Sequence, residues 1–257
     1  MKTHDVKSVV GDLPHMTLEQ AEKITKFIAD QQIETILELG FNRGVSTCYM
    51  AAVLSELGRG SISTIDLAWA REVTPNIEEL LDRIGERHRV KVFYEPTSYT
   101  WRMMRFLEED PTPRFDFCYL DGAHSWFVDA LAFFLVDRLL RPGGWIIFDD
   151  LDWTYATSSS LKESEMVRSM PLDEQVTPQV KQIYELLVKT HPHYHNFRVE
   201  EGWAFAQKRD AKDISTLAGQ REIVTEQIVR VERIQVGLGG GLMQIVNRLM
   251  RKVKWQA

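Results

Sequence analysis

Apolar positions along the first two thirds of the chain follow two alternating patterns, which predict strands and helices in turn. Almost continuous apolar runs predict five buried strands, at residues 33–39, 61–67, 90–94, 115–120 and 145–148. Between these strands, apolar positions recur every three or four residues, as on one face of an α-helix. Another helical pattern begins at Thr17, before the first strand. These patterns predict helices at residues 44–57, 74–84, 98–107 and 124–140. Strands that alternate with helices in this way form a parallel sheet with helices on both faces.

The pattern changes after residue 180. Residues 180–190 still have helical spacing, but residues 196–200 and 203–207 alternate apolar and polar positions around Glu201-Gly202. Such alternation on both sides of a short turn predicts an antiparallel hairpin. We therefore expect a Rossmann-like, doubly wound α/β fold, with a mostly parallel seven-stranded sheet that ends in this hairpin.

Two segments fall outside this alternation. Residues 151–177 are rich in Ser, Thr and charge, and they follow the fifth strand at the sheet edge where doubly wound folds bind ligands. We interpret this segment as a lid over the substrate, with a mobile surface loop as the alternative. Residues 211–257 have helical spacing again, interrupted at residues 237–241. We therefore expect a domain of residues 1–210 followed by a helical C-terminal extension of residues 211–257.

Composition restricts the class of protein. With 257 residues, 44% hydrophobic and 26% charged, the chain resembles ordinary soluble globular proteins. Cys48 and Cys118 lie in apolar runs, and we find neither a signal peptide nor an apolar run of about 20 residues, so we expect a reduced, cytoplasmic protein. The net charge of −6 argues against nucleic acid as a partner.

The expected C-terminal extension is basic, unlike the rest of the chain. It holds eight Lys and Arg against four Asp and Glu, so the remaining residues carry a net charge of −10. Leu242, Ile245 and Leu249 begin an apolar stripe opposite Arg and Lys side chains, with Trp255 near its end. We favour a protein contact for this helix, in a homo-oligomer or against the acidic domain. Peripheral contact with an anionic membrane is the alternative.

The turn after the first strand carries the most specific motif. Residues 36–46 read Ile-Leu-Glu-Leu-Gly-Phe-Asn-Arg-Gly-Val-Ser, an apolar strand that runs through two spaced glycines into a helix. Glycine allows the backbone to turn sharply and to come close to a nucleotide cofactor. Asp66, at the end of the next strand, can accept hydrogen bonds from both hydroxyls of a ribose. Because the glycines are not spaced G-x-G-x-x-G, a nicotinamide cofactor is disfavoured.

Three carboxylates form the second motif. Asp121 follows the fourth predicted strand, and Asp149 and Asp150 follow the fifth, which should be its neighbour in the sheet. Like charges placed this close together favour a bound cation, and Mg²⁺ prefers oxygen ligands. The alternative is that Asp149 and Asp150 cap the next turn while Asp121 orders its own loop.

Together these motifs resemble those of class I S-adenosylmethionine (SAM)-dependent methyltransferases. They are most similar to the catechol O-methyltransferase, macrocin O-methyltransferase and cephalosporin-hydroxylase-like groups, over roughly residues 15–208. The resemblance implies a SAM site made of Glu38, Gly40, Phe41, Asn42, Ser46, Asp66, Leu67 and Ser98. In that site Asp66 would bind the ribose hydroxyls and Ser46 the methionine carboxylate. Ser98 would bind the adenine, with a helix-capping role as its alternative.

The same resemblance implies that Asp121, Asp149 and Asp150 bind Mg²⁺. Three residues after the first of these aspartates, the catechol enzyme has a lysine as general base, whereas this chain has His124. An imidazole with an ordinary pKa of about 6.5 is largely neutral near pH 7 and can accept a proton. We therefore expect His124, beside Asp121, to take the proton of an attacking hydroxyl. The alternative is that His124 only caps the helix that follows.

These motifs favour a Mg²⁺-dependent O-methyltransferase that acts on a small hydroxylated molecule, such as a sugar, a polyol or a catechol. Metal-independent N- or O-methylation is one alternative, and a SAM-binding partner protein without catalysis is another. His191, His193 and His195 form a further cluster, spaced by two residues, that can bind a metal ion. We favour the simpler interpretation that they are surface histidines.

Overall fold

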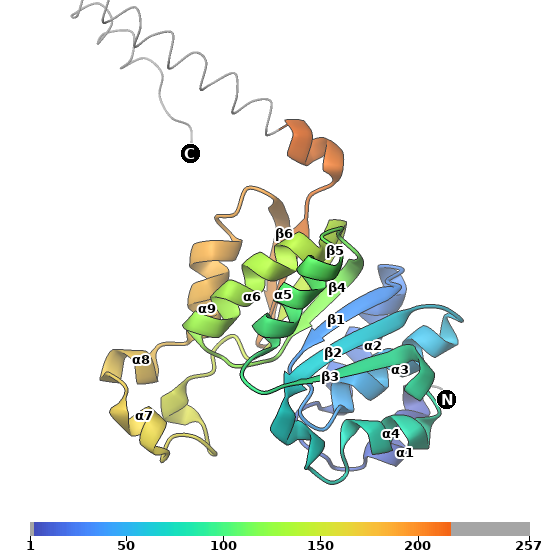
Figure 1. Cartoon of the computed structure of the whole chain (residues 1–257), viewed down its shortest axis with the longest axis horizontal. Helices are drawn as coiled ribbons and strands as arrows, with labels where there is room; N and C mark the ends of the chain where they lie inside the picture. The colour runs from blue at the N-terminus through green and yellow to red at the C-terminus, as the bar shows by residue number, and fades with distance from the viewer. Residues whose placement is uncertain (1–2, 217–257) are drawn as a thin grey trace, which may run out of the picture. The chain divides into compact units, whose positions relative to one another are not determined.

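A seven-stranded sheet forms the centre of the computed structural model, which describes residues 3–216. Its strands lie in the order β3-β2-β1-β4-β5-β7-β6 (Figure 1). β7 runs antiparallel to both of its neighbours, β5 and β6. In chain order the strands are β1 (Thr35–Leu39), β2 (Ser61–Leu67), β3 (Val90–Glu95), β4 (Phe115–Leu120), β5 (Leu140–Phe148), β6 (Tyr194–Glu200) and β7 (Trp203–Lys208). The predicted doubly wound fold with a terminal hairpin is therefore confirmed.

Helices cover both faces of this sheet (Figure 1). Helices α1 to α4 pack together on one side, and α5, α6 and α9 pack on the other. Their bounds are α1 (Thr3–Val10), α2 (Leu18–Asp30), α3 (Val45–Glu56), α4 (Ile77–Ile84), α5 (Tyr99–Glu109), α6 (Trp126–Leu139) and α9 (Gln179–Ile183), which continues as the π-helical turn η4 (Tyr184–Val188). Successive strand residues enter opposite cores, Ile36 on the α3 side and Leu37 on the α6 side. This two-sided burial explains why the strands are almost continuously apolar.

The segment of residues 151–177 is made of short helical pieces. It contains η3 (Tyr155–Thr157), α7 (Glu165–Ser169) and α8 (Leu172–Val176), and α7 and α8 lie beyond the main body of the sheet in Figure 1. Two further short turns, η1 (Ala68–Arg71) and η2 (Arg87–Arg89), precede α4 and β3. Helices of five residues are too short to produce a recognisable apolar period, so the sequence indicated only irregular structure here.

Two of the predicted helices begin later in the chain than the sequence indicated. Helix α4 starts later than predicted because Asn76 and Glu79 form its capping box, which leaves Pro75 outside the helix. Helix α6 likewise starts at Trp126, so His124 lies in the loop before it. The alternative role of His124 as a helix cap therefore does not apply.

Contacts divide the chain into two compact units, residues 1–209 and residues 210–257. The first unit contains the whole sheet and every predicted site residue. In the second, residues 211–216 are helical, and the predicted apolar and basic stripe of residues 242–254 lies outside the described residues. None of the helices within residues 3–216 is long and apolar enough to cross a membrane.

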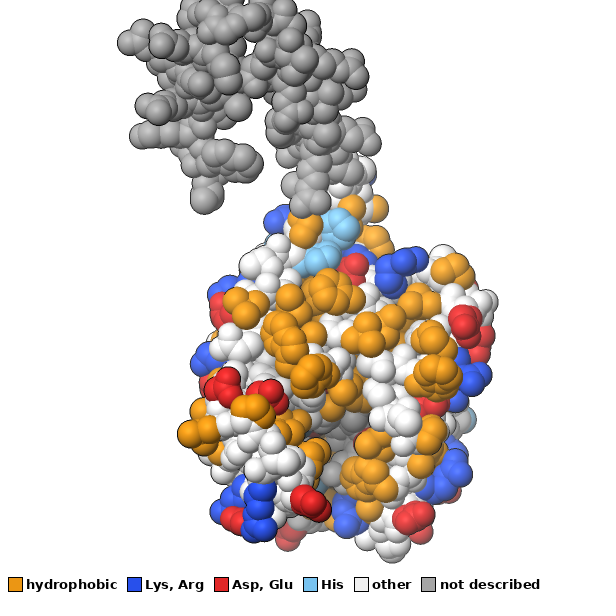
Figure 2. Space-filling view, turned by 60° about the vertical axis from the view of Figure 1, so that its left-hand side comes forward, with side chains coloured by type: hydrophobic (Ala, Val, Ile, Leu, Met, Phe, Trp, Pro, Cys, Tyr) orange, Lys and Arg blue, Asp and Glu red, His pale blue; other side chains and the backbone are white. Residues whose placement is uncertain are grey.

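Hydrophobic side chains gather on one face of the first unit (Figure 2). Three exposed ones follow each other along α6: Phe127 is 77% exposed, Leu131 51% and Phe134 46%. Exposed apolar stripes of this kind are typical of contact surfaces. The expected homo-oligomer stays a prediction.

Candidate active site

A cavity of about 890 Å³ opens at the carboxyl edge of the parallel strands. The segments that follow β1 to β5 line it, together with the loop before α2 and part of residues 151–177. This is the edge at which doubly wound folds bind ligands. Small-molecule sites typically measure about 300–1,000 Å³, so the cavity has room for a cofactor and an acceptor together.

The turn after β1 lies directly against the loop that follows β4. Gly40 in this turn has a φ of +87°, and a Cβ there would lie 1.9 Å from the backbone oxygen of Asp121. Only glycine can occupy such a position without displacing the neighbouring backbone. Gly40 therefore allows the two motifs predicted from the sequence to meet at one cavity.

Asp66 holds the same turn from the end of β2. Its Oδ2 accepts hydrogen bonds from the backbone nitrogens of Phe41 (2.9 Å) and Asn42 (2.6 Å), and its Oδ1 accepts one from Leu67 (2.6 Å). Burial raises the pKa of Asp66, although these backbone hydrogen bonds act in the opposite direction. The structure thus shows Asp66 ordering the turn, and its contact with a ribose stays a prediction.

Glu38 is the one predicted SAM-site residue that does not line the cavity. Its carboxylate is fully buried and accepts hydrogen bonds from the hydroxyls of Ser46 (2.5 Å), Thr47 (2.5 Å) and Thr64 (2.6 Å). Burial raises the pKa of Glu38 to about 7. The structure thus shows Glu38 supporting the turn from behind, through Ser46, and its contact with the cofactor stays a prediction.

The other predicted SAM-site residues all line the cavity, namely Gly40, Phe41, Asn42, Ser46, Asp66, Leu67 and Ser98. Ser98 also caps α5, because its hydroxyl accepts a hydrogen bond from the backbone nitrogen of Thr100 at 3.1 Å. The capping role is therefore present in the structure, and a contact between Ser98 and adenine stays a prediction.

Four non-glycine residues of the cavity wall have left-handed backbone. Their φ values are +83° for His15, +49° for Asn42, +53° for His124 and +54° for Asp150. This conformation is costly for residues with a Cβ, and it persists where the surrounding structure enforces it. Such strained positions concentrate at functional sites, and here four of them share one cavity.

Asp121, His124 and Asp150 meet at this cavity. His124 Nε2 lies 3.1 Å from Asp150 Oδ2 and 3.6 Å from Asp121 Oδ1, and the three side chains offer ligand atoms within 4.8 Å of one another. Nε2 is buried, yet it makes no well-directed hydrogen bond with either carboxylate. A buried nitrogen between two carboxylates marks a position that suits a cation.

The charge of His124 differs from the expectation. Burial lowers its pKa, but the nearby carboxylates of Asp121 and Asp150 outweigh burial and raise the pKa to about 10. Without a cation nearby, His124 is therefore an imidazolium at neutral pH and cannot accept a proton. This corrects the expectation of a largely neutral imidazole.

Asp149 lies on the cavity wall, but its carboxylate is engaged elsewhere. Its Oδ2 accepts a hydrogen bond from the Tyr119 hydroxyl, and its Oδ1 accepts one from the backbone nitrogen of Asp150 at 2.7 Å. Burial, followed by the charge of Asp121, raises the pKa of Asp149 to about 7. Among the described residues, His124 rather than Asp149 joins Asp121 and Asp150 in the cluster of candidate ligand atoms.

A buried pair that the sequence did not indicate holds the loop between β4 and α6. The Tyr99 hydroxyl donates a hydrogen bond to Asp129 and accepts one from the backbone nitrogen of Ala123 at 3.2 Å. Asp129 in turn accepts one from the backbone nitrogen of Ser125 at 3.0 Å. The pair positions the loop that carries Asp121 and His124. Its members occupy ordinary helix positions, so no sequence pattern marks them.

Residues 151–177 contribute an aromatic wall. The Trp153 ring lies against His124, with ring centroids 4.8 Å apart, and against Tyr155 at 4.9 Å. Trp153 and Leu161 both line the cavity. The segment therefore adjoins the site as expected, and its movement as a lid stays a prediction.

Comparisons with known proteins agree with this geometry. A family model described as a methyltransferase domain matches residues 37–151, and no curated protein sequence matches the chain. The O-methyltransferase from Bacillus cereus, solved with S-adenosylhomocysteine (SAH), is 22% identical, with a TM-score of 0.55 over 80% of this chain and 90% of that one.

Two further solved structures are similar to the same extent. TomG, the SAM-bound O-methyltransferase from Streptomyces achromogenes involved in tomaymycin synthesis, is 19% identical, with a TM-score of 0.56 over 80% of this chain and 89% of that one. The SAH-bound Podospora anserina methyltransferase PaMTH1 is 17% identical, with a TM-score of 0.59 over 80% and 87%. At these identities the likeness establishes the fold, and the family match covers the part of the chain from β1 to the end of β5. Residues 37–151 therefore match a methyltransferase domain, and the chain has the fold of class I, SAM-dependent methyltransferases.

Proposed function

We propose that this methyltransferase transfers the methyl group of SAM to a hydroxyl of a small molecule, and that it does so with a divalent cation, Mg²⁺. The convergence of Asp121, His124 and Asp150 at a cavity lined by the predicted SAM-site residues carries this proposal. The similar fold of two O-methyltransferases solved with SAH or SAM supports the cofactor and the oxygen acceptor.

The cavity fits SAM in two respects. Gly40 lines the cavity, and its missing Cβ lets this turn lie directly against the Asp121 backbone, as a tight nucleotide cradle requires. Asp66 already accepts three backbone hydrogen bonds, and a carboxylate can accept about four. In this conformation Asp66 therefore has room for about one ribose hydroxyl rather than for both.

The donor set fits a divalent cation. Two carboxylates are brought together beside an imidazole, and the positive charge of His124 offsets theirs. Mg²⁺ and Mn²⁺ prefer such carboxylate-rich sites. When bound, the ion would lower the pKa of a hydroxyl beside it and weaken the hold of Asp121 and Asp150 on the His124 proton.

The residues of the chain then have distinct tasks. His124, once neutral, accepts the hydroxyl proton at Nε2 while the acceptor oxygen attacks the methyl carbon of SAM. The bond between carbon and sulfur breaks, and SAH leaves. Asp121 and Asp150 fix the position of the reacting groups, while Trp153 limits the access of water from the side of the lid segment.

The test is the formation of SAH from SAM with a panel of catechols, phenols, sugars and polyols, in Mg²⁺ or in EDTA. We expect Mg²⁺-dependent turnover with at least one acceptor, which Asp150→Asn abolishes. The matched control is Asp152→Asn, because Asp152 is exposed, pairs with Lys181 at 2.7 Å and lies outside the cavity. Turnover that requires neither Mg²⁺ nor Asp150, or that occurs only with amine acceptors, would overturn the proposal.

A further inference from the structure

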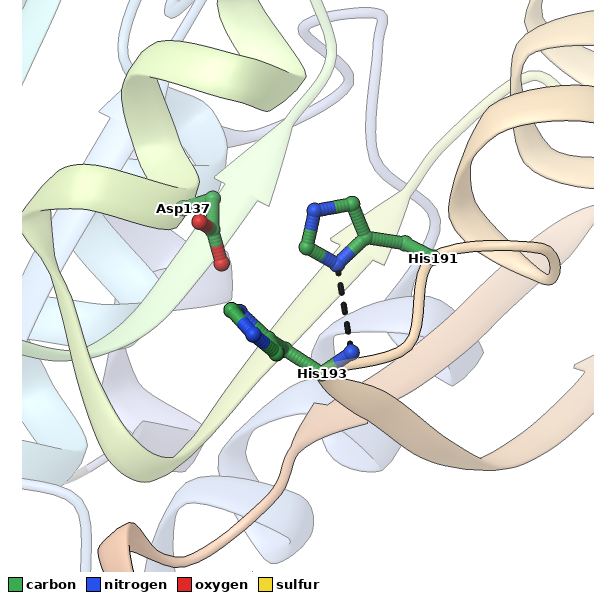
Figure 3. A group of neighbouring side chains, drawn as sticks. All are labelled: Asp137, His191 and His193. Carbon is green, nitrogen blue, oxygen red and sulfur yellow. Dashed lines mark hydrogen bonds between the residues drawn. The ribbon is translucent and has the colours of Figure 1, made fainter. Parts of the chain in front are cut away.

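We propose a second metal site, for a borderline transition-metal ion such as Zn²⁺, formed by Asp137, His191 and His193 (Figure 3). Each of the three side chains offers a ligand atom, and these atoms lie within 4.8 Å of one another. None of the three residues lines the large cavity. The site is therefore distinct from the cation position beside His124.

Two elements bring these residues together. Asp137 lies in the last turn of α6, whereas His191 and His193 flank Pro192 in the segment between η4 and β6. Figure 3 shows both imidazole rings beside the Asp137 carboxylate. His195, the next histidine of the motif, follows in β6 and is not part of the cluster. The spacing seen in the sequence thus supplies two ligands, and the fold adds the third.

The ligand types favour Zn²⁺ over Mg²⁺. Two imidazoles and a carboxylate are typical ligands of zinc, at about 2.0–2.2 Å from the ion, which places neighbouring ligand atoms of a tetrahedral site roughly 3.3–3.6 Å apart. The separations of up to 4.8 Å must therefore shrink by roughly 1 Å. Small side-chain rotations can provide this, because all three residues are only partly buried.

Asp137 supplies a second, independent observation. Its Oδ1 is buried and forms an ion pair with the Lys208 ammonium at 3.2 Å, outside hydrogen-bonding geometry. Lys208 instead donates to the backbone oxygens of Asp137 and Leu140. A carboxylate has two oxygens, so one can bind an ion while the other stays near Lys208. The positive charge of Lys208 opposes the ion, and we therefore expect only moderate affinity.

Aromatic contacts hold the His191 ring beside the site. The ring packs edge-on against Phe133, with centroids 5.5 Å apart, and against Tyr194 at 5.4 Å. Its Nδ1 accepts a long hydrogen bond, 3.3 Å, from the backbone nitrogen of His193. An ion bound at Nε2 moves the ring proton to Nδ1 and replaces this weak bond, while the aromatic contacts keep the ring in place.

Calorimetric titration of Zn²⁺ into the full chain tests the site, with saturating Mg²⁺ and SAH present to occupy the cavity. We expect one Zn²⁺ per chain. The affinity for Zn²⁺ should be at least about 100-fold weaker in His193→Gln, because mutating even a residue that only hydrogen-bonds to a metal ligand weakens metal binding about 10–100-fold. The matched control is His195→Gln, which removes a histidine of the same motif from outside the cluster. Its affinity for Zn²⁺ should equal that of the unchanged protein.

Circular dichroism first establishes that each variant is folded, and His191→Gln replaces His193→Gln if the latter is not. The proposal would be overturned if these variants bound Zn²⁺ as tightly as the unchanged protein. It would also be overturned if the unchanged protein did not bind Zn²⁺. The readout does not involve methyl transfer. Failure of this site would therefore leave the proposed function unaffected.

Discussion

Glu38 is a fully buried acid whose carboxylate is bonded to three hydroxyl groups. Burial raises its pKa from 4.5 to about 7. Between these two values the folded chain binds more protons at Glu38 than the unfolded chain does. The contribution of Glu38 to stability therefore falls as the pH rises through this range and is constant above it.

Glu38→Gln should remove this pH dependence. From the shift of the pKa, Glu38 alone lowers the free energy of unfolding by on the order of 3 kcal/mol between pH 4.5 and pH 8. Urea unfolding of both proteins at pH 5 and pH 8 measures this effect. The stability of the variant relative to the unchanged protein should increase at the higher pH. A difference that is the same at both pH values would show that Glu38 does not titrate in this range.

Residue patterns predicted which side chains gather at the site, but not their charges or exact partners. Asp121 and Asp150 could be placed because each follows a strand, and neighbouring strands end at one edge. The pKa of His124 could not be predicted, because it depends on a distance of 3.1 Å to Asp150 that left-handed backbone at both residues creates. The engagement of Asp149 by Tyr119 has the same kind of cause, a contact across the sheet.

Among the elements, the turn between β1 and α3 has the strictest requirement for one residue type. Gly40 and Gly58 both have positive φ. A Cβ at Gly40 would meet the Asp121 backbone, whereas a Cβ at Gly58 would have no atom within 4 Å. Both Gly→Ala variants incur backbone strain of about 1–2 kcal/mol. Only Gly40→Ala adds a clash with the loop that carries Asp121.

We therefore expect Gly58→Ala to lower the free energy of unfolding by about 1–2 kcal/mol and to leave the affinity for SAH unchanged. Gly40→Ala should lower the free energy of unfolding by roughly twice as much as Gly58→Ala or more. It should also weaken SAH binding at least about 10-fold, because the turn must move. Urea unfolding and calorimetry with SAH measure the two effects. Equal losses in the two variants would contradict the role assigned to the close approach at Gly40.

Long periodic elements were predictable, and short or capped ones were less so. β2 and β4 have the predicted bounds because their apolar runs are flanked by clear breaks. Helices α7 and α8 were missed because five residues cannot show a helical period. The contact of Asp137 with His191 and His193 joins α6 to a segment some fifty residues later, and no local pattern reports such a contact.

At the scale of the whole molecule, residues 1–209 form a compact unit that contains the cavity and all of its lining residues. A chain that ends at Arg209 should therefore fold and bind SAH with the affinity of the full chain. Thermal unfolding and calorimetry with SAH compare the two proteins. If the shortened chain folds but binds SAH more weakly, residues 210–257 contribute to the cofactor site.

The central claim is that Asp121 and Asp150 hold a divalent cation next to His124 and beside the bound cofactor. The most direct test is calorimetric titration of Mg²⁺ into the SAH-loaded protein, repeated on Asp150→Asn and on its control Asp152→Asn. We predict saturable binding of one Mg²⁺ that Asp150→Asn abolishes and Asp152→Asn retains. Binding of SAH without any binding of Mg²⁺, or equal binding of Mg²⁺ by both variants, would contradict the claim.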